Sequence, residues 1–210
     1  MEEAGASLAE ELQALGQKVA FQRCDITDTT QFQQAIKQFD QMHGPCLVLV
    51  NNAANDTRMD WRKVTPDEFN RRISVNLAHA FFAIQAVAPG MIAARQGSVV
   101  NFGSISWMAA QAGIPVYTAA KAAIHGMTRS FARELGKHNI RVNTVVPGWV
   151  MTNRQLDLWV DDAANDLINR SQCLAGRVQP EDIAAIVTFL ASDDARMCSA
   201  QNFVVDGGWV

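Results

Sequence analysis

Residues 46–54 read CLVLVNNAA, five apolar residues followed by a polar turn. A short, continuous apolar run that ends in turn residues is typical of a strand buried on both faces of a parallel sheet. Segments with strand-like and helix-like patterns alternate on either side of this run, as the crossovers of a parallel sheet require. The pattern therefore predicts an α/β fold with a doubly wound, mostly parallel sheet, and ligands that bind beyond the carboxyl ends of its strands.

The expected elements follow from apolar spacing and from turn residues. We expect strands at residues 18–24, 46–50, 97–102, 141–146 and 203–206. We expect helices at residues 2–15, from about 30 to Gly44, from the Thr65 cap to about 94 with a bend near Pro89, at 115–136 and at 180–191. Residues 152–172 are expected to be irregular with helical patches, and residues 1–210 to form a single domain.

Bulk composition excludes several classes of protein. A net charge of −3 gives no electrostatic footprint for nucleic acid or an anionic membrane. The four cysteines are widely spaced without a CxxC pair, which argues against a zinc site or a disulfide framework and fits a reducing cytoplasm. The chain shows no signal-peptide pattern, and we expect no apolar run long enough to span a bilayer.

Three residues have the spacing of a proton-transfer site. The only tyrosine, Tyr117, lies four residues before Lys121 and thirteen after Ser104. Positions i and i+4 share a helix face, so the phenol and the ammonium can point the same way. A phenol with a pKa of about 10 is a poor base at neutral pH, but a nearby ammonium favours the phenolate. With a serine hydroxyl on the same substrate oxygen, these groups can carry out half of an alcohol–carbonyl redox reaction, and the hydride half needs a cofactor.

The glycine-rich turn that usually opens a doubly wound domain is absent from this sequence. Gly5 and Gly16 flank or end a helix and follow no strand. We therefore expect a fold that lacks the first strand, the phosphate-binding turn and the second strand, and that exposes an apolar sheet edge or face. A protein that is longer at its N-terminus is favoured over a truncated product.

These motifs, in this order, resemble the short-chain dehydrogenase/reductase family. Asn51–Ala54 is similar to the family's Asn-Asn-Ala-Gly turn, with Ala54 in place of glycine, and Asn76 matches its fourth catalytic position. The resemblance implies that Lys121 holds the nicotinamide ribose and lowers the pKa of Tyr117. It implies that Asn76 bends its helix and holds a water in a proton relay. It also implies a homotetramer and NAD or NADP as cofactor, with contacts from Asp25, Ile26, Asn52, Ala53, Tyr117, Lys121, Pro147, Gly148, Val150 and Thr152.

Longer strings resemble a subgroup that oxidises free aldoses. These are NNAAND, NFGSISW, PGWVMT, RQLDLW, QCL and VDGGW, which are similar to xylose-, galactose- and arabinose-type sugar 1-dehydrogenases. The resemblance implies a small sugar as substrate, with hydride transfer from C1 to the nicotinamide. It assigns the substrate contacts to Ser104, Ser106, Gln111, Asn55 and Trp149.

Other interpretations stay open at this point. Asp25 fits a turn or a cap as well as an adenine contact, and Trp107 fits a core position. The four histidines show no metal-ligand spacing, and no metal is expected. The chain could also be a generic short-chain reductase of ketones or acyl-thioester carbonyls, or a non-catalytic subunit that kept the fold.

Overall fold

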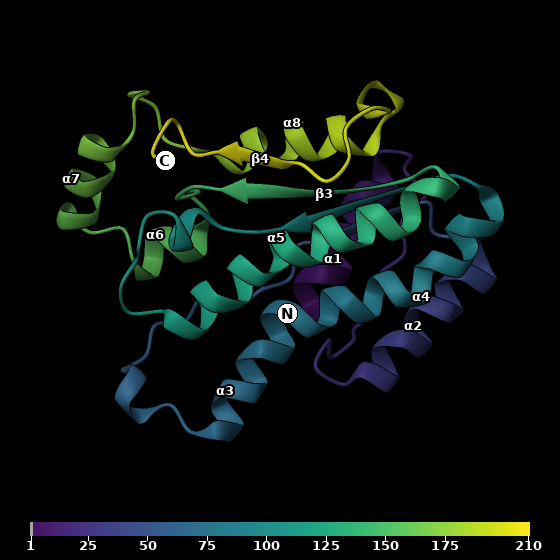
Figure 1. The fold of residues 1–210 in the computed structure, drawn as a ribbon, viewed down its shortest axis with the longest axis horizontal. Helices are drawn as coiled ribbons and strands as arrows, with labels where there is room; N and C mark the ends of the chain where they lie inside the picture. Colours follow the sequence, from purple (N-terminus) through teal and green to yellow (C-terminus); the bar gives the residue numbers. More distant parts are fainter. Residues whose placement is uncertain (1) are drawn as a thin grey trace.

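Four parallel strands form the sheet of the computed structural model, which describes residues 2–210. They are β1 (Val48–Asn51), β2 (Gly97–Phe102), β3 (Ile140–Pro147) and β4 (Asn202–Val205), in the spatial order β1-β2-β3-β4. Every neighbouring pair is parallel. The predicted α/β architecture with a parallel sheet is confirmed (Figure 1).

Helices cover both faces of this sheet. Figure 1 shows α2, α4 and α5 on one side and α8 on the other, while α6 and α7 lie beyond the carboxyl ends of the strands. The α-helices are α1 (Glu2–Ala14), α2 (Thr29–His43), α3 (Pro66–Ile73), α4 (His79–Ala94), α5 (Pro115–Leu135), α6 (Asn153–Leu158), α7 (Asp162–Ser171) and α8 (Pro180–Ala191). A π-helical turn, Ser74–Ala78, joins α3 to α4, and short 3₁₀ turns lie at Trp61–Lys63, Ile105–Trp107, Gly136–His138 and Asp193–Ala195.

Local chemistry explains where these helices begin and end. The Thr65 hydroxyl accepts a hydrogen bond from the amide of Glu68 at 3.2 Å, and Pro66 occupies the first turn, as the sequence predicts. The Asp28 carboxylate caps α2 in the same way, through the amide of Gln31. Gly44 ends α2 with a φ of 86°, a conformation that favours glycine.

Alternating side chains of β2 and β3 divide the core between the two faces. Val99 and Val142 pack with Ile84, Val87 and Met91 of α4. Val100 and Val145 point the other way, into a second cluster with residues of α8. Both clusters are almost fully buried, as expected of a sheet with helices on both faces.

A buried chain of polar side chains crosses the α5 face of the sheet. Asn51 at the end of β1 donates its amide to Asn101 of β2 at 2.8 Å, and Asn101 donates its own amide to the Thr128 hydroxyl of α5 at 2.9 Å. The Thr144 hydroxyl of β3 also donates to Thr128, at 2.8 Å. These bonds connect three strands to one helix.

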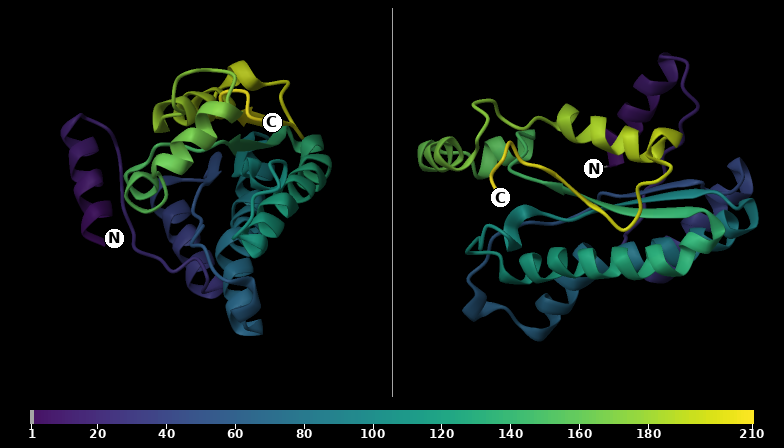
Figure 2. Two further views of the ribbon diagram at one scale, coloured as in Figure 1. Left: turned by 90° about the vertical axis from the view of Figure 1, so that its left-hand side faces the viewer. Right: turned by 45° about the horizontal axis from the view of Figure 1, so that its top comes forward.

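The predicted strand at residues 18–24 is wrong. Residues 17–25 form neither helix nor strand, and they fold back along α1, where Gln13 donates its side-chain amide to the carbonyl of Val19 at 2.8 Å. Figure 2 shows α1 standing to one side of the sheet and its helices. A strand requires a neighbouring backbone to pair with, and within residues 2–210 no strand lies beside this segment.

The β1 strand lies at the edge of the sheet. Its outer side pairs with no strand among the described residues, and its side chains Val48 and Val50 are 43% and 40% exposed. This matches the expected exposure of apolar sheet surface.

One helical segment differs from the expectation about membrane spans. Residues 66–94 are long and apolar enough, by length and composition, to cross a bilayer. Core helices of soluble proteins can have the same length and apolar composition. The α4 part of this segment packs its apolar face on the sheet, where Ala83, Ile84 and Met91 have no exposed surface.

The polar chain generates a prediction about stability. Thr128→Val keeps the side-chain volume but leaves Asn101 and Thr144 without their shared partner, which should lower the free energy of unfolding by about 1–3 kcal/mol. The matched control is Thr188→Val on the exposed side of α8, where the hydroxyl bonds only the carbonyl of Ala184. Urea unfolding of both variants measures the difference. Equal unfolding midpoints for the two variants would contradict a structural role for these buried hydrogen bonds.

Candidate active site

A cavity of about 1150 Å³ lies at the carboxyl ends of the strands. The loops after β1, β2 and β3 meet there with the start of α5 and with α6 and α7. Eleven of the predicted site residues line it: Asn52, Ala53, Ser104, Gln111, Tyr117, Lys121, Pro147, Gly148, Trp149, Val150 and Thr152. The fold therefore gathers most of the predicted site into one place.

Tyr117 and Lys121 enter this cavity from the first turns of α5. Lys121 is only 2% exposed, and its ammonium donates a hydrogen bond of 2.8 Å to the carbonyl of Phe102 at the end of β2. The Lys121 Nζ atom lies 5.8 Å from the centre of the Tyr117 ring. The i, i+4 spacing thus places both groups on one face, as the sequence predicts.

Burial shifts the pKa values of both groups. It lowers the pKa of Lys121 from 10.5 to about 8. Burial also raises the pKa of Tyr117 from 10.0 to about 12, against the opposite effect of the Ser104 hydroxyl, and the negative charge of Asp56 adds to the rise. The pKa of Tyr117 is thus raised overall, because loss of water around the buried phenol has the largest effect, and the expected stabilisation of the phenolate by Lys121 stays a prediction.

Ser104 and Ser106 lie on one short turn but face different surroundings. The Ser104 hydroxyl caps the 3₁₀ turn Ile105–Trp107 by accepting the amide of Ser106 at 3.1 Å, and it lines the cavity. The Ser106 side chain is 1% exposed, lies outside the cavity lining, and its hydroxyl has no hydrogen-bond partner among the described residues. A tight turn directs neighbouring side chains apart, which the spacing alone does not reveal.

Asn76 supports the site rather than lining it. It is fully buried in the π-helical turn, so the helix is interrupted at the expected place. Its side-chain oxygen accepts the amide of Asn55 at 2.8 Å, and its side-chain nitrogen donates to the carbonyl of Asn55 at 3.1 Å. The Asn55 side chain closes a turn with the amide of Thr57 and does not reach the cavity lining. Asn76 therefore holds the loop after β1 by its backbone.

Asp25 and Ile26 are not brought to the cavity. The Asp25 carboxylate accepts hydrogen bonds from the amide and the hydroxyl of Thr27, at 2.9 and 2.8 Å, and these bonds lower its pKa. The side chain thus closes a turn, which is the alternative that the sequence left open. Its position follows from the unpaired segment 17–25 described above.

Several lining residues were not predicted as site residues, although four of them lie in the strings NNAAND and RQLDLW. They are Asp56 and Arg58 from the loop after β1, and Arg154, Gln155 and Trp159 from α6 and its end. Pairs among them are separated by almost a hundred residues in the chain, so only the fold brings them together.

His79 is a buried group that sequence spacing did not single out. It is 4% exposed, and neither ring nitrogen has a hydrogen-bond partner among residues 2–210. Burial and the nearby Lys121 charge lower its pKa to about 4, so the imidazole is neutral at physiological pH.

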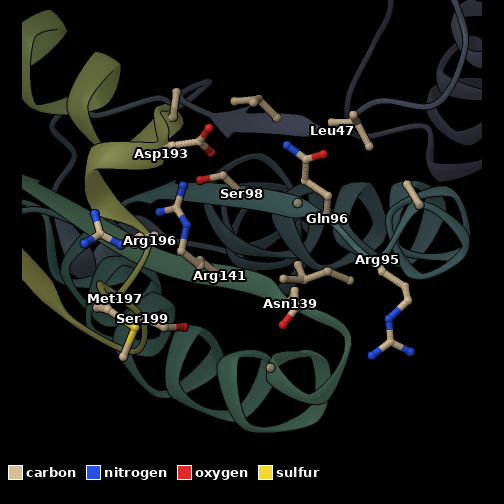
Figure 3. Close-up of a pocket in the computed structure, with 16 residues that line it drawn as sticks. Leu47, Arg95, Gln96, Ser98, Asn139, Arg141, Asp193, Arg196, Met197 and Ser199 are labelled. Atoms are coloured by element: carbon tan, nitrogen blue, oxygen red, sulfur yellow. The ribbon is translucent and has the colours of Figure 1, made fainter.

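A second cavity, of about 560 Å³, lies at the opposite, amino ends of the strands. Figure 3 shows Arg95, Arg141 and Arg196 around it, with the side chain of Arg95 directed away from the other two. Arg141 is held by the carbonyl of Ser192 at 3.1 Å. None of the predicted site residues lines this cavity. In the described part of the chain no cluster of three or more side chains could hold a metal ion.

Comparisons with known proteins identify relatives of this chain. A family model described as enoyl-(acyl carrier protein) reductase matches residues 1–210. The chain is 47% identical over 189 residues to a D-xylose 1-dehydrogenase of Caulobacter vibrioides, covering 90% of this chain and 74% of that protein. It is 39% identical over 207 residues to a protein of Rhizobium meliloti named probable galactose dehydrogenase, covering 98% of this chain and 81% of that protein.

A solved structure extends the likeness to three dimensions. A gluconate 5-dehydrogenase from Burkholderia cenocepacia, in complex with NADP and tartrate, superposes with a TM-score of 0.92 at 29% identity, covering 100% of this chain and 82% of that one. This chain belongs to the short-chain dehydrogenase/reductase family. It is therefore an oxidoreductase acting on CH–OH groups with NAD or NADP, as the sequence motifs predict.

The cavity fits one end of such a cofactor. Lys121 spends one of its three N–H donors on Phe102, which leaves two for ribose hydroxyls. The cavity is large enough for a nicotinamide riboside and a small substrate together, since drug-sized ligands occupy about 300–1,000 Å³. The predicted adenine contacts lie outside it, so the described residues fit the nicotinamide and its ribose rather than the adenosine.

The burial of Lys121 predicts an unusual dependence of stability on pH. The folded protein releases the Lys121 proton from about pH 8, whereas an unfolded lysine keeps it to about pH 10.4. The unfolded state binds more protons in this window, so the free energy of unfolding should rise with pH. Relative to Lys121→Met, the wild type should become more stable by up to about 3 kcal/mol.

Urea unfolding at several pH values measures this difference. Tyr117 is present in both proteins, so its own titration largely cancels. Lys137→Met, at an exposed lysine, serves as the control and should follow the wild type. Parallel curves for wild type and Lys121→Met would show that the ammonium is not buried as described.

Proposed function

We propose that this enzyme oxidises an aldose at C1, passing a hydride to NAD or NADP and giving an aldonolactone. The observation that carries the proposal is the group of polar side chains that line the cavity together with Tyr117. Asp56, Arg154, Gln155 and Gln111 offer donors and acceptors suited to a ring with several hydroxyls. The similarity to a D-xylose 1-dehydrogenase along 90% of the chain supports the same substrate class.

In this proposal Tyr117, Ser104 and Lys121 handle the proton. Ser104, which lines the cavity together with Tyr117, holds the anomeric oxygen of the sugar beside the phenol. Tyr117 takes the proton from that oxygen while the C1–H bond breaks. Lys121 stabilises the phenolate and holds the ribose, and Asn76 fixes the loop that encloses the substrate. NAD or NADP, when bound, accepts the hydride.

The remaining predicted contacts divide between the two ligands. Asn52, Ala53, Pro147, Gly148, Val150 and Thr152 are proposed to contact the cofactor, and Gln111 and Trp149 the sugar. Gly148 has a specific reason to be glycine, because a Cβ atom there would lie 2.7 Å from the backbone of Asp206. Asp25, Ile26, Asn55 and Ser106 would need to move before they could touch either ligand.

The matching family model supports a second candidate activity. Its description names an enoyl-(acyl carrier protein) reductase, whose substrates are acyl thioesters. The alternative is a generic short-chain reductase of ketones or acyl-thioester carbonyls. Charged side chains along the cavity wall favour a polyhydroxylated substrate over an acyl chain.

We also propose a homotetramer of single-domain subunits in the cytoplasm. Ala119, Ala123 and Gly126 form an exposed strip of small residues on α5, which allows close packing of a second helix. Phe69 and Phe81, on α3 and α4, are 45% and 41% exposed. Light scattering measures the assembly directly.

A substrate panel tests the reaction. We expect turnover of at least one of xylose, arabinose, galactose, fucose and glucose, with the best and worst epimers differing at least about tenfold in kcat/KM. The absorbance of reduced nicotinamide is followed with NAD and with NADP. Turnover of a ketone or an acyl thioester, but of no aldose, would reject the substrate class and keep the oxidoreductase.

Tyr117→Phe tests the base. The change removes only the phenol hydroxyl, so kcat should fall by about 10²–10⁴-fold while binding of reduced nicotinamide is nearly unchanged. Cofactor fluorescence measures the binding, and Lys121→Met should impair both properties. A variant that retains more than about a tenth of wild-type kcat would exclude tyrosine as the base.

A further inference from the structure

One carboxylate, that of Asp56, connects several of the side chains that line the cavity. Asp56, in the loop after β1, accepts hydrogen bonds from Nε and Nη2 of Arg154 on its Oδ1 atom, at 3.3 and 3.4 Å. Its Oδ2 atom accepts the side-chain amide of Gln155 at 2.5 Å. Gln155 in turn accepts the indole N–H of Trp149 at 3.0 Å. A chain of contacts thus runs from the loop after β1 through α6 to the loop after β3.

This carboxylate keeps capacity for a ligand. A carboxylate offers about four lone-pair sites, and the single strong donor on Oδ2 leaves one site there free. The Asp56 side chain is 26% exposed, and it lines the cavity that Tyr117 and Lys121 enter. The Arg154 side chain is 51% exposed, so the ion pair adds little to folding stability.

Asp56 also lies close enough to the reacting phenol to affect it. Its negative charge raises the pKa of Tyr117, which opposes formation of the phenolate. Without a substrate, this carboxylate makes the phenolate of Tyr117 less stable. A role in holding the substrate would account for a carboxylate at this position.

The neighbouring side chains present a different surface. The Arg58 guanidinium lies 4.4 Å from the centre of the Trp159 ring and 5.8 Å from that of Trp149. Its charge is therefore directed at the indoles. A carboxylate beside aromatic surface suits a sugar ring, which has hydroxyls at its edge and C–H groups on its faces.

We propose that Asp56 determines substrate specificity by accepting a hydrogen bond from a sugar hydroxyl other than the one at C1. Gln155 and Arg154 hold the carboxylate in position, and they act as positioning residues. This inference rests on the proposed aldose oxidation and deepens it by naming the group that recognises the ring.

The test pairs a change in the enzyme with a change in the substrate. Asp56→Asn keeps the size of the side chain but removes its charge, and kcat/KM for the best aldose should fall about tenfold to a hundredfold. The 2-, 3- and 4-deoxy analogues of that aldose are measured with both proteins. For wild type, one analogue should be far poorer than the parent, and for Asp56→Asn, whose amide oxygen is a weaker acceptor, the difference between that analogue and the parent should be several-fold smaller.

Asp60→Asn is the matched control. Asp60 lies in the same loop, pairs with Arg62 at 2.8 Å, and has a side chain that is 30% exposed, but it does not line the cavity. This variant should keep the wild-type pattern with every analogue. Asp56→Ser, which also removes the carboxylate, should repeat the Asp56→Asn pattern, so a folding defect in one variant does not decide the outcome.

The results separate the inference from the proposed function. If wild type oxidises an aldose but Asp56→Asn matches wild type, or loses the same factor on every analogue, the role of Asp56 is overturned and the sugar assignment stands. If wild type oxidises no aldose, both are overturned.

Discussion

The position of the whole site depends on how α5 is fixed to the sheet. Thr128 receives hydrogen bonds from Asn101 of β2 and Thr144 of β3, and Asn101 is in turn bonded by Asn51 at the end of β1. Apolar contacts alone would allow the helix to slide along the strands, because dispersion and hydrophobic contacts have little directional preference. Buried hydrogen bonds are directional, and each one left unmade is costly. They fix the point at which Tyr117 and Lys121, more than one turn earlier on α5, pass the ends of the strands.

The protonation states of Tyr117 and Lys121 without ligands differ from those that the proposed reaction needs. Burial favours the neutral forms of Tyr117 and Lys121, so the protein by itself does not favour a phenolate beside an ammonium. Asp56 increases this tendency at the phenol. An oxidised nicotinamide carries a positive charge, and a bound sugar would occupy the Asp56 carboxylate. In the proposed reaction, these two ligands would favour the phenolate that the protein by itself does not favour.

Much of this could be predicted from the sequence, because the signals were local. A continuous apolar run located β1, the Thr65–Glu68 cap located the start of α3, and the i, i+4 spacing placed Tyr117 and Lys121 together. The errors came where a residue depends on a distant one. Residues 18–24 have a strand-like composition but no neighbouring strand in the described chain. Asp25, which comes directly after them, therefore lies outside the cavity. Asn55 and Ser106 lie next to cavity residues, yet tight turns direct their side chains elsewhere. Asp56 and Gln155 lie in two of the strings that resemble sugar dehydrogenases, but they are ninety-nine residues apart, and only the fold shows that they are bonded.

The π-helical turn at Ser74–Ala78 has a consequence for how this protein can change. A π turn amounts to one residue inserted into an α-helix, and it interrupts the regular backbone ladder. Deleting one residue there would restore a continuous helix from Pro66 to Ala94 and strengthen it locally. The same deletion would rotate Asn76 away from Asn55 and release the loop that carries Asp56. A regular helix and an ordered loop therefore exclude each other at this position. Selection for a more stable helix here would lower turnover.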